Sequence, residues 1–518
     1  MSEEKVVGQI VGGTFGELLI RKKRDERIQL GEILVVEDKG EKHFLQVYDI
    51  RYCSQLSQQN LEMISGLQLE ESNKVEILDE HIRNYTLAIA KSILYISQNK
   101  ITLPKSLPSF LKKVRRLRKE DVGFLTRPEK SLYMGTLRSG DNSINVPFFL
   151  DGEKVMSHHI LLAATTGRGK SNLTSVLLWD LVGKGYAGCL VLDPHDEYFK
   201  SSKEKVGLEN HPNKDYVVYY SKSPQRGGNT LSINLNELKP KHFSGVINLS
   251  GPQKEALYYF YSKYKQDWIR ALFENKETPN GFQESSISVL RRKVSGLLEI
   301  WEDEGGLKEE SIFQRQGGET TISSICSSLE EGKTVIIDTS LLSSSQEIFV
   351  GSIIAANILE RYSSYKRKNS LREKPVISII LEEAPRVIGK EALESGPNVF
   401  SKIAREGRKF KVGLYAITQL PSLIPTSILA NMNTKIIMGI EMKSERQSLI
   451  ESCPQDLSEE GKNIASLDKG EAIISSTFSR FALPVSIPLI NDYVKERKNN
   501  TEDAEEENRN TKKAIIGM

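Results

Sequence analysis

The sequence has few cysteines, and they are far apart. Its 518 residues include only Cys53, Cys189, Cys326 and Cys453, and none of them forms the C-x-x-C spacing that is typical of zinc sites. Small secreted proteins that depend on disulfides carry cysteines at a much higher density. We therefore expect reduced, mostly buried thiols and neither a structural zinc site nor a disulfide framework.

Long hydrophobic runs are also lacking. No stretch reaches the ~18 apolar residues that a membrane-spanning helix needs. The first five residues are of mixed charge and include no apolar segment of the kind that signal peptides have. The sequence therefore predicts a cytoplasmic protein without a membrane partner.

An excess of one charge is missing as well. Lys and Arg number 71 against 68 Asp and Glu, which gives a formal net charge of +3. Any nucleic-acid binding must therefore come from the placement of charges, because the overall balance does not favour it. The length, with 38% hydrophobic residues, allows two or three folded domains.

The first part of the chain shows short β-rich runs broken by glycine, from Val6 to about Arg51. This pattern predicts a small antiparallel barrel over residues 1–55. Leu61 to Gln98 is expected to be largely helical, and a basic run from Lys112 to Lys119 follows it. We therefore expect a helical segment and a basic linker over residues 56–130.

Buried apolar strands alternate with helical stretches from about Asn145 onward, which is typical of a parallel α/β sheet. We expect the core domain in two parts, residues 131–252 and 331–494, separated by a helical insertion at 253–330. The tail, residues 495–518, is charged and rich in Asn and Glu, so we expect it to be disordered.

A phosphate-binding loop lies between an apolar strand and an apolar helix. The segment Ala164-Thr-Thr-Gly-Arg-Gly-Lys-Ser matches G-x-x-x-x-G-K-[ST] except at its first position. Glycines allow successive N–H groups to face phosphate oxygens, Lys170 adds a charge, and Ser171 is the expected Mg²⁺ ligand. The expected ATP-binding residues are Thr166, Gly167, Arg168, Gly169, Lys170, Ser171 and Asn172.

Two acids close another apolar strand, Val376 to Leu381. A P-loop ATPase needs one carboxylate for the metal and one to polarise the attacking water, and we assign these roles to Glu382 and Glu383. A strand that simply ends in solvated acids is the alternative. Asp193, after a third strand, is a further candidate for the metal, although Asp before Pro is also a common turn starter.

Polar residues between and after these strands complete the candidate site. Gln419 closes the strand from Val412 and could contact the γ-phosphate or the water. Arg405 or Arg408 could reach the γ-phosphate of a neighbouring subunit as an arginine finger. A solvated basic face and contacts with DNA phosphates are the alternatives for these arginines.

Taken together, these motifs resemble those of the HerA family of hexameric DNA translocases, in the HerA and FtsK branch of RecA-like ATPases. The resemblance spans most of the chain. It rests on the motifs Asp193-Pro-His-Asp-Glu-Tyr, Glu382-Glu383-Ala384, Ile403-Ala-Arg-Glu-Gly-Arg-Lys-Phe and Ala416-Ile-Thr-Gln-Leu-Pro-Ser.

The resemblance implies a RecA-like P-loop ATPase core with an N-terminal barrel of the type shared with ATP synthase subunits. It implies ATP and Mg²⁺ as cofactors, a homo-hexamer, and catalytic roles for Lys170, Glu382, Glu383 and Gln419, with Arg405 or Arg408 as the finger. Two positions depart from the family. Asp196 stands where glycine is usual, and His158 where arginine is frequent, so the charge there would depend on pH.

Two functions follow from the resemblance. The first is an ATP-driven double-stranded DNA translocase that works with a partner nuclease such as NurA in end processing or defence. The alternative is an ATP-regulated scaffold that assembles and activates an effector, a nuclease or a sirtuin-like enzyme, in an antiphage system.

Overall fold

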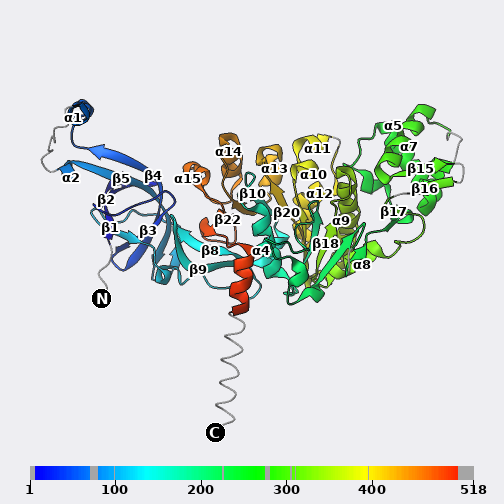
Figure 1. Ribbon diagram of the computed structural model, residues 1–518, viewed down its shortest axis with the longest axis horizontal. Coiled ribbons are helices and arrows are strands. Elements are labelled where there is room, and N and C mark those ends of the chain that lie inside the picture. Colours follow the sequence, from blue (N-terminus) through cyan, green and yellow to red (C-terminus); the bar gives the residue numbers. More distant parts are fainter. Residues whose placement is uncertain are drawn as a thin grey trace, which may run out of the picture.

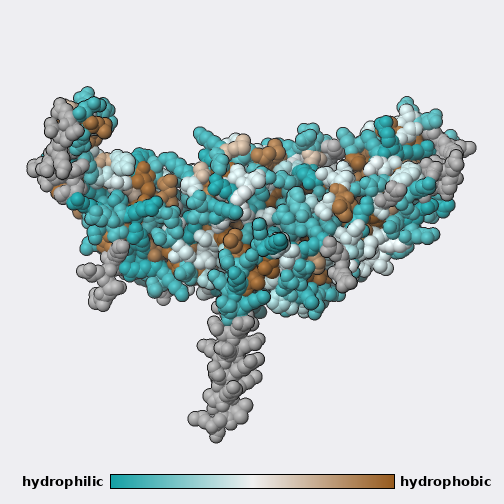
Figure 2. Space-filling model, in the orientation of Figure 1, coloured by the Kyte–Doolittle hydropathy of each residue, from teal (hydrophilic) through white to brown (hydrophobic). Residues whose placement is uncertain are grey.

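The computed structural model describes residues 6–70, 80–98, 100–224, 227–274, 280–303, 306–309, 311–394 and 396–499. Figure 1 shows an elongated molecule with a β-barrel at one end, a helical insertion at the other and an α/β core between them. The face shown in Figure 2 is largely hydrophilic, with hydrophobic residues in small scattered groups, as is usual for folded proteins.

The barrel is antiparallel. Its strands are β1 (Val6–Thr14), β2 (Glu17–Lys22), β3 (Ile33–Asp38), β4 (Glu41–Ser54), β5 (Asn84–Ser97), β6 (Lys100–Thr102) and β7 (Lys113–Arg116). They follow the order β2-β1-β7-β3-β4-β5-β6, and the pairing of β2 with β5 closes the sheet. Alternate side chains such as Ile20, Leu34 and Leu45 point inward into one apolar cluster. The predicted antiparallel barrel is confirmed, but it does not end at residue 55, because β5, β6 and β7 also belong to it.

The helical prediction for Leu61 to Gln98 is wrong in its second half. Helices α1 (Gln58–Glu70) and α2 (Glu80–Arg83) are present, but Asn84–Ser97 forms β5, which pairs with both β4 and β2. The β-branched and aromatic residues of this segment favour a strand, and the long-range pairing with β4 and β2 stabilises it.

The basic run also belongs to the barrel, because residues 113–116 form β7 between β1 and β3. Arg115, predicted in a linker, is instead buried and bonded to Asp121 at 2.7 Å and to Glu37 at 2.5 Å. Its charge is used to hold the barrel together.

The core is one twelve-stranded sheet. Its strands are β8 (Ser131–Ser139), β9 (Asn142–Asp151), β10 (Ile160–Ala163), β11 (Ala187–Asp193), β12 (Val217–Ser221), β13 (Asn229–Thr230), β18 (Thr334–Asp338), β19 (Val376–Leu381), β20 (Val412–Thr418), β21 (Thr434–Ile437), β22 (Glu471–Ser476) and β23 (Leu483–Ser486). The order is β13-β12-β18-β11-β19-β20-β10-β21-β22-β23-β8-β9. Strands from β13 to β21 in this order are parallel.

Helices cover both faces of this sheet. They are α3 (Gly152–Ser157), α4 (Lys170–Leu181), α8 (Thr321–Glu330), α9 (Ser344–Arg367), α10 (Pro385–Ile388), α11 (Lys390–Glu394), α12 (Val399–Glu406), α13 (Thr426–Leu429), α14 (Lys443–Ser452) and α15 (Gly461–Ser466). Leu161 of β10 lies in one apolar cluster, whereas its neighbours Ile160 and Leu162 lie in the other. The sheet is therefore buried on both faces, which explains its continuous apolar strands.

The insertion is mainly helical, as predicted, and it also contains short strands. Its elements are α5 (Gly251–Tyr264), α6 (Trp268–Glu274), α7 (Glu284–Leu298) and the hairpin β15 (Ile300–Asp303) with β16 (Gly306–Glu309). Strand β14 (Ile233–Asn234) pairs with β17 (Phe313–Gln314). Trp268 is fully buried and donates to the Leu238 carbonyl at 2.8 Å, which fixes the insertion on the core.

A buried polar contact joins the barrel to the core. Glu460, just before α15, accepts from Gln46 of β4 at 3.3 Å and pairs with Lys91 of β5 at 3.7 Å. Lys462 of α15 pairs with Asp49 of β4 at 2.8 Å. These charges belong to both parts of the chain, so they fix the position of the barrel on the core.

The tail is ordered at its beginning. Residues 490–499 form a helix, and within it Tyr493 and Arg497 both donate to the Asp180 carboxylate at 2.8 Å. The expected disorder is therefore wrong up to residue 499, because these bonds anchor the segment to α4. The expectation for residues 500–518 lies outside the described residues.

Two expectations from composition can be compared with the fold. All four cysteines are free; Cys189 and Cys326 are buried, and the other two are half-buried. Among the helices in the described ranges, none combines the length and apolar character needed to cross a bilayer.

Candidate active site

The P-loop lies at the carboxyl end of β10, in the turn that leads into α4. Gly167 and Gly169 have φ angles of +81° and +104°. Residues with a side chain rarely adopt these angles, so glycine is needed where the loop turns. Ala164, at the first position of the motif, is buried and is not among the residues with positive φ. Alanine is therefore tolerated there.

Lys170 is the cation of this loop. Its Nζ lies 3.1 Å from the Ala164 carbonyl oxygen and 3.4 Å from that of Thr165. Burial lowers the pKa of Lys170, and the nearby Glu383 and Glu382 carboxylates oppose that shift. A half-buried ammonium held only by neutral carbonyls favours an anion at this point.

The backbone of the loop also suits a phosphate group. Within the described residues, the N–H groups of Thr166, Gly167, Arg168 and Gly169 donate to no acceptor, and α4 begins directly after them. A Cβ atom added at Gly167 would meet open space. Unpaired N–H groups at a helix N-terminus form an anion site, so these residues fit the triphosphate of ATP.

A chain of hydrogen bonds links the P-loop to the acid pair. Thr166 Oγ1 donates to Gln419 Oε1 at 2.7 Å, and Gln419 Nε2 donates to Glu383 Oε1 at 3.1 Å. The sheet order explains this, because β20, which ends before Gln419, lies between β10 and β19. Three residues that are far apart in the sequence therefore meet at one edge of the sheet.

Glu383 has an unusual backbone conformation. Its φ angle is +48°, a left-handed conformation that costs a residue with a side chain about 1 kcal/mol or more. The turn is held by hydrogen bonds from Arg386 N to the Glu383 carbonyl and from Ala384 N to Ile417 O, both 2.9 Å. The strained turn is where the carboxylate meets Gln419, and such strain is typical of functional positions.

Glu382 lies in a different environment from Glu383. The hydroxyl of the buried Tyr198 donates to Glu382 Oε1. Burial raises the pKa of Glu382, and the Tyr198 hydrogen bond opposes that rise. The two adjacent acids are thus held separately, one by Tyr198 and one by Gln419.

Asp193 stabilises the turn that carries Tyr198. Its buried carboxylate accepts from the backbone N–H groups of His195 at 3.3 Å and Tyr198 at 3.1 Å. Burial raises its pKa to about 6, against the lowering effect of these backbone hydrogen bonds. Asp193 therefore fixes the turn that carries Tyr198.

Asp196, where a glycine was expected, has a φ angle of +51°. A left-handed residue at this position explains why glycine suits it. The aspartate is held there by Lys200 at 2.5 Å and by the Tyr219 hydroxyl at 3.0 Å. These two bonds offset the strain of the substitution.

Two of the predicted ATP-binding residues contact other parts of the chain. Arg168 donates to Leu467 O at 3.0 Å and to Glu441 at 2.7 Å. The Asn172 amide donates to Pro488 O and accepts from Ile490 N, both at 2.9 Å. Both side chains attach the P-loop to the last strands of the core and the C-terminal segment.

The predicted arginine fingers, Arg405 and Arg408, form no hydrogen bond with the P-loop or the acid pair within the described residues. Arg405 lies in the last turn of α12, and Arg408 lies in the short turn Gly407–Phe410 that follows this helix. Both are exposed, and neither side chain has a hydrogen bond or ion pair within the described residues. Their own chain's site does not use them.

The histidine pair before the P-loop strand has positional roles. Burial, followed by the charge of Arg408, lowers the pKa of His158, so the expected pH-dependent cation is neutral at neutral pH. His159 is buried, and its Nδ1 accepts from Leu414 N at 3.0 Å. Neither replaces the charge of an arginine.

Sequence reasoning missed Tyr198 as a residue of the site. It closes the Asp193-Pro-His-Asp-Glu-Tyr motif, and that position was the available signal. The fold and this site together define a P-loop ATPase with a RecA-like α/β core.

Comparisons with known proteins agree with this class. Residues 132–358 match the family described as helicase HerA, central domain. The chain is 25% identical to the DNA double-strand break repair helicase HerA of Saccharolobus solfataricus, covering 93% of this chain and 92% of that protein. A probable HerA of Methanocaldococcus jannaschii is 28% identical, over 66% of this chain and 73% of its own.

Among solved structures, the plasmid coupling protein TrwB in complex with a GTP analogue is similar, with a TM-score of 0.46 and 12% identity. That match covers 72% of this chain and 93% of that chain. With its P-loop, its acid pair and its barrel, the chain is similar to HerA helicases over most of its length, and its residues 132–358 match the central domain of that family.

Proposed function

We propose that the protein is an ATP-hydrolysing, ring-forming double-stranded DNA translocase or helicase of the HerA type. The observation that carries the proposal is the chain from Thr166 through Gln419 to Glu383. It connects the phosphate loop to a carboxylate in a protein whose curated relatives are named as DNA double-strand break repair helicases.

The first step of the reaction is the binding of the triphosphate. The loop N–H groups and Lys170 would bind the phosphate oxygens, and Lys170 would exchange its carbonyl contacts for charge-assisted ones. Mg²⁺, when bound with ATP, would be held by Ser171 and Glu382, and Asp193 would support the site. The ion would neutralise phosphate charge. Tyr198 keeps the Glu382 oxygen in place.

Glu383 would act as the general base. A water molecule beside the γ-phosphate would give its proton to this carboxylate as its oxygen attacks phosphorus, and ADP would leave. Gln419 contacts both the P-loop and Glu383, so a γ-phosphate that displaces Thr166 from Gln419 would reorient the base. Hydrolysis would then depend on the presence of the third phosphate.

A further positive charge at the γ-phosphate would come from an arginine of a neighbouring subunit. Arg405 and Arg408 are exposed and have no partner in the described part of their own chain. We propose that one of them reaches the γ-phosphate bound by the next subunit of a homo-hexamer, as arginine fingers do. ATP would then be hydrolysed only in the assembled ring.

We further propose that the ring moves along duplex DNA and acts with a separate partner nuclease, in DNA end processing or in defence. The names of the curated relatives support the first setting. The cytoplasmic location stays a prediction.

The test combines purification of the native complex, identification of the proteins that come with it, and ATPase assays with and without duplex DNA. We expect duplex DNA to stimulate hydrolysis and salt to weaken the stimulation. An effector complex whose activity survives Glu383→Gln but not disruption of the ring would favour the scaffold function instead.

A further inference from the structure

A second cationic site lies on the barrel, far along the molecule from the P-loop (Figure 1). It is a hollow of about 700 Å³ between β1, β2, β7 and the beginning of β5. Five of its lining residues are cationic and one is acidic. They are Arg21, Lys22, Lys23, Arg24 and Lys113, with Asp25 as the acid.

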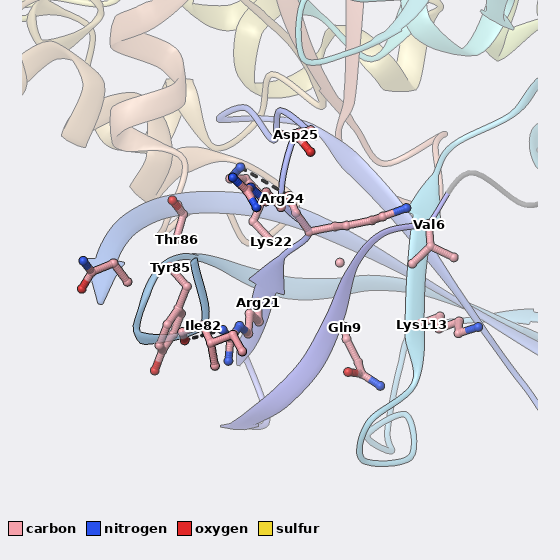
Figure 3. A pocket seen from close by; sticks show the side chains of 13 residues that line it. Val6, Gln9, Arg21, Lys22, Arg24, Asp25, Ile82, Tyr85, Thr86 and Lys113 are labelled. Carbon is pink, nitrogen blue, oxygen red and sulfur yellow. Dashed lines mark hydrogen bonds between the residues drawn. The ribbon is translucent and has the colours of Figure 1, made fainter. Parts of the chain in front are cut away.

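One arginine of this hollow is held in a fixed position. The Arg21 guanidinium lies 4.2 Å from the centre of the Tyr85 ring, and its Nη2 donates to the Ile82 carbonyl at 2.7 Å. Figure 3 shows these three side chains together at one side of the hollow. Nε and Nη1 have no partner among the described residues, so two N–H donors of a fixed guanidinium remain available to an oxyanion.

The other cations add charge around it. Lys22 Nζ donates to the carbonyl oxygens of Glu26 at 2.8 Å and Lys23 at 3.4 Å, which are both neutral partners. Lys23, Arg24 and Lys113 are exposed, and their side chains form no hydrogen bond or ion pair within the described residues. Figure 3 shows Arg21 and Lys22 of β2, Arg24 of the turn after it and Lys113 of β7 at different sides of the hollow.

We propose that this hollow binds the phosphate backbone of duplex DNA. Fixed and mobile cations around a concave surface suit a ligand with many equivalent phosphates. Arg21 covers the Tyr85 ring, so the ring is not free to stack an unpaired base as single-strand sites require. Among the described residues that line the hollow, only Val6 and Ile82 are aliphatic, and protein partners need larger apolar anchors.

This inference rests on the proposed function and adds to it. The barrel would hold the duplex by its backbone, without regard to sequence, while the core hydrolyses ATP. In a ring, the same hollow would recur on every subunit, so the duplex could pass from one barrel to the next.

The test compares the wild-type protein with a triple variant, K23E/R24E/K113E. The matched control is K203E/K214E/K222E, which makes the same charge change at three exposed lysines of the core. Binding of a fluorescent duplex is measured over a range of KCl concentrations, and melting temperatures check that each variant is folded.

We expect the barrel variant to bind the duplex at least about tenfold more weakly at low salt. The slope of log K against log salt should fall by about two to three, since each lost phosphate contact removes about 0.9. The control variant should keep the wild-type affinity and slope.

Other outcomes would overturn the proposal. If the wild-type protein binds duplex and the barrel variant binds it equally with the same slope, the hollow is not the site, although the proposed function survives. If the wild-type protein binds no DNA, the proposed function fails as well.

Two competitors separate the remaining ligands. We expect unlabelled duplex to displace the labelled one much better than poly-glutamate or inorganic phosphate at an equal concentration of charge. Equal displacement by poly-glutamate would assign the hollow to an acidic protein segment, and equal displacement by inorganic phosphate to a small free anion.

Discussion

The two cationic regions of this chain hold their charges in different ways. At the edge of the core, Lys170 is half-buried and fixed by two carbonyl oxygens, and each acid of the pair has its own partner. In the barrel hollow, only Arg21 and Lys22 are fixed, and the other three cations are exposed and unpaired within the described chain. A fixed arrangement suits one small anion in one pose, whereas mobile cations suit a polyanion.

The largest expected effect comes from Glu383, the proposed general base at the edge of the core sheet. We expect Glu383→Gln to lower ATP turnover by about 10²–10⁴, because general bases contribute rate factors of that size, while ATP binding remains. Steady-state hydrolysis and equilibrium binding of a fluorescent ATP analogue measure the two quantities. Robust hydrolysis by this variant would contradict the assigned base.

Lys170→Ala should have the next largest effect. Removal of a fixed cation from a phosphate site costs about 3 kcal/mol, which corresponds to roughly 100-fold weaker binding. Titration calorimetry with ATP measures this loss. Lys222→Ala, at an exposed lysine of the core, is the control and should bind as the wild type does.

Tyr198→Phe tests whether the function of Glu382 depends on its hydrogen bond with Tyr198. Loss of a hydrogen bond to a charged group costs about 1.5–3 kcal/mol, so we expect about a tenfold fall in kcat/KM and a higher Mg²⁺ concentration for half-maximal activity. Nucleotide binding without Mg²⁺ should stay unchanged. A fall in binding without Mg²⁺ would instead show a general packing role.

A last prediction concerns stability instead of activity, at His159, the residue that precedes the P-loop strand β10. Burial lowers the pKa of His159 to about 4, against about 6.5 in an unfolded chain. The unfolded state therefore binds the extra proton between these values, and stability due to His159 is lost as pH falls from about 6.5 to 4, by up to about 3 kcal/mol.

His159→Asn should remove this part of the pH dependence. Asparagine offers an acceptor for Leu414 N and tolerates the φ angle of +63° at this position. The measurement is the difference in melting temperature between variant and wild type from pH 7 to 4, which cancels the opposite contribution of Asp193. Parallel curves for the two proteins would show that His159 does not titrate in this range.

The sequence was most informative where chemistry is local. The P-loop from Ala164 to Ser171, the acid pair and Gln419 were all predictable, because each follows a buried strand and parallel strands end at one edge. The contacts that hold the acid pair in place were less predictable. The contact of Tyr198 with Glu382 depends on a turn held by Asp193, and the left-handed φ of Glu383 depends on the strands beside it.

The barrel shows the limit of local patterns. Strand β5 contains β-branched and aromatic residues, which favour a strand, but its role in the barrel depends on pairing with β2 and β4. The basic run through Arg115 looked like a linker for the same reason, since its carboxylate partners lie elsewhere in the chain. The cations of the hollow come together only when β1, β2 and β7 are side by side.

The most direct test of the account is the ATPase rate of the assembled wild-type protein with duplex DNA, single-stranded DNA and no DNA, over a range of salt concentrations. The account predicts stimulation by duplex DNA that weakens steeply with salt and is absent in Glu383→Gln. A rate that is indifferent to DNA of any form, with or without a copurified partner, would contradict it.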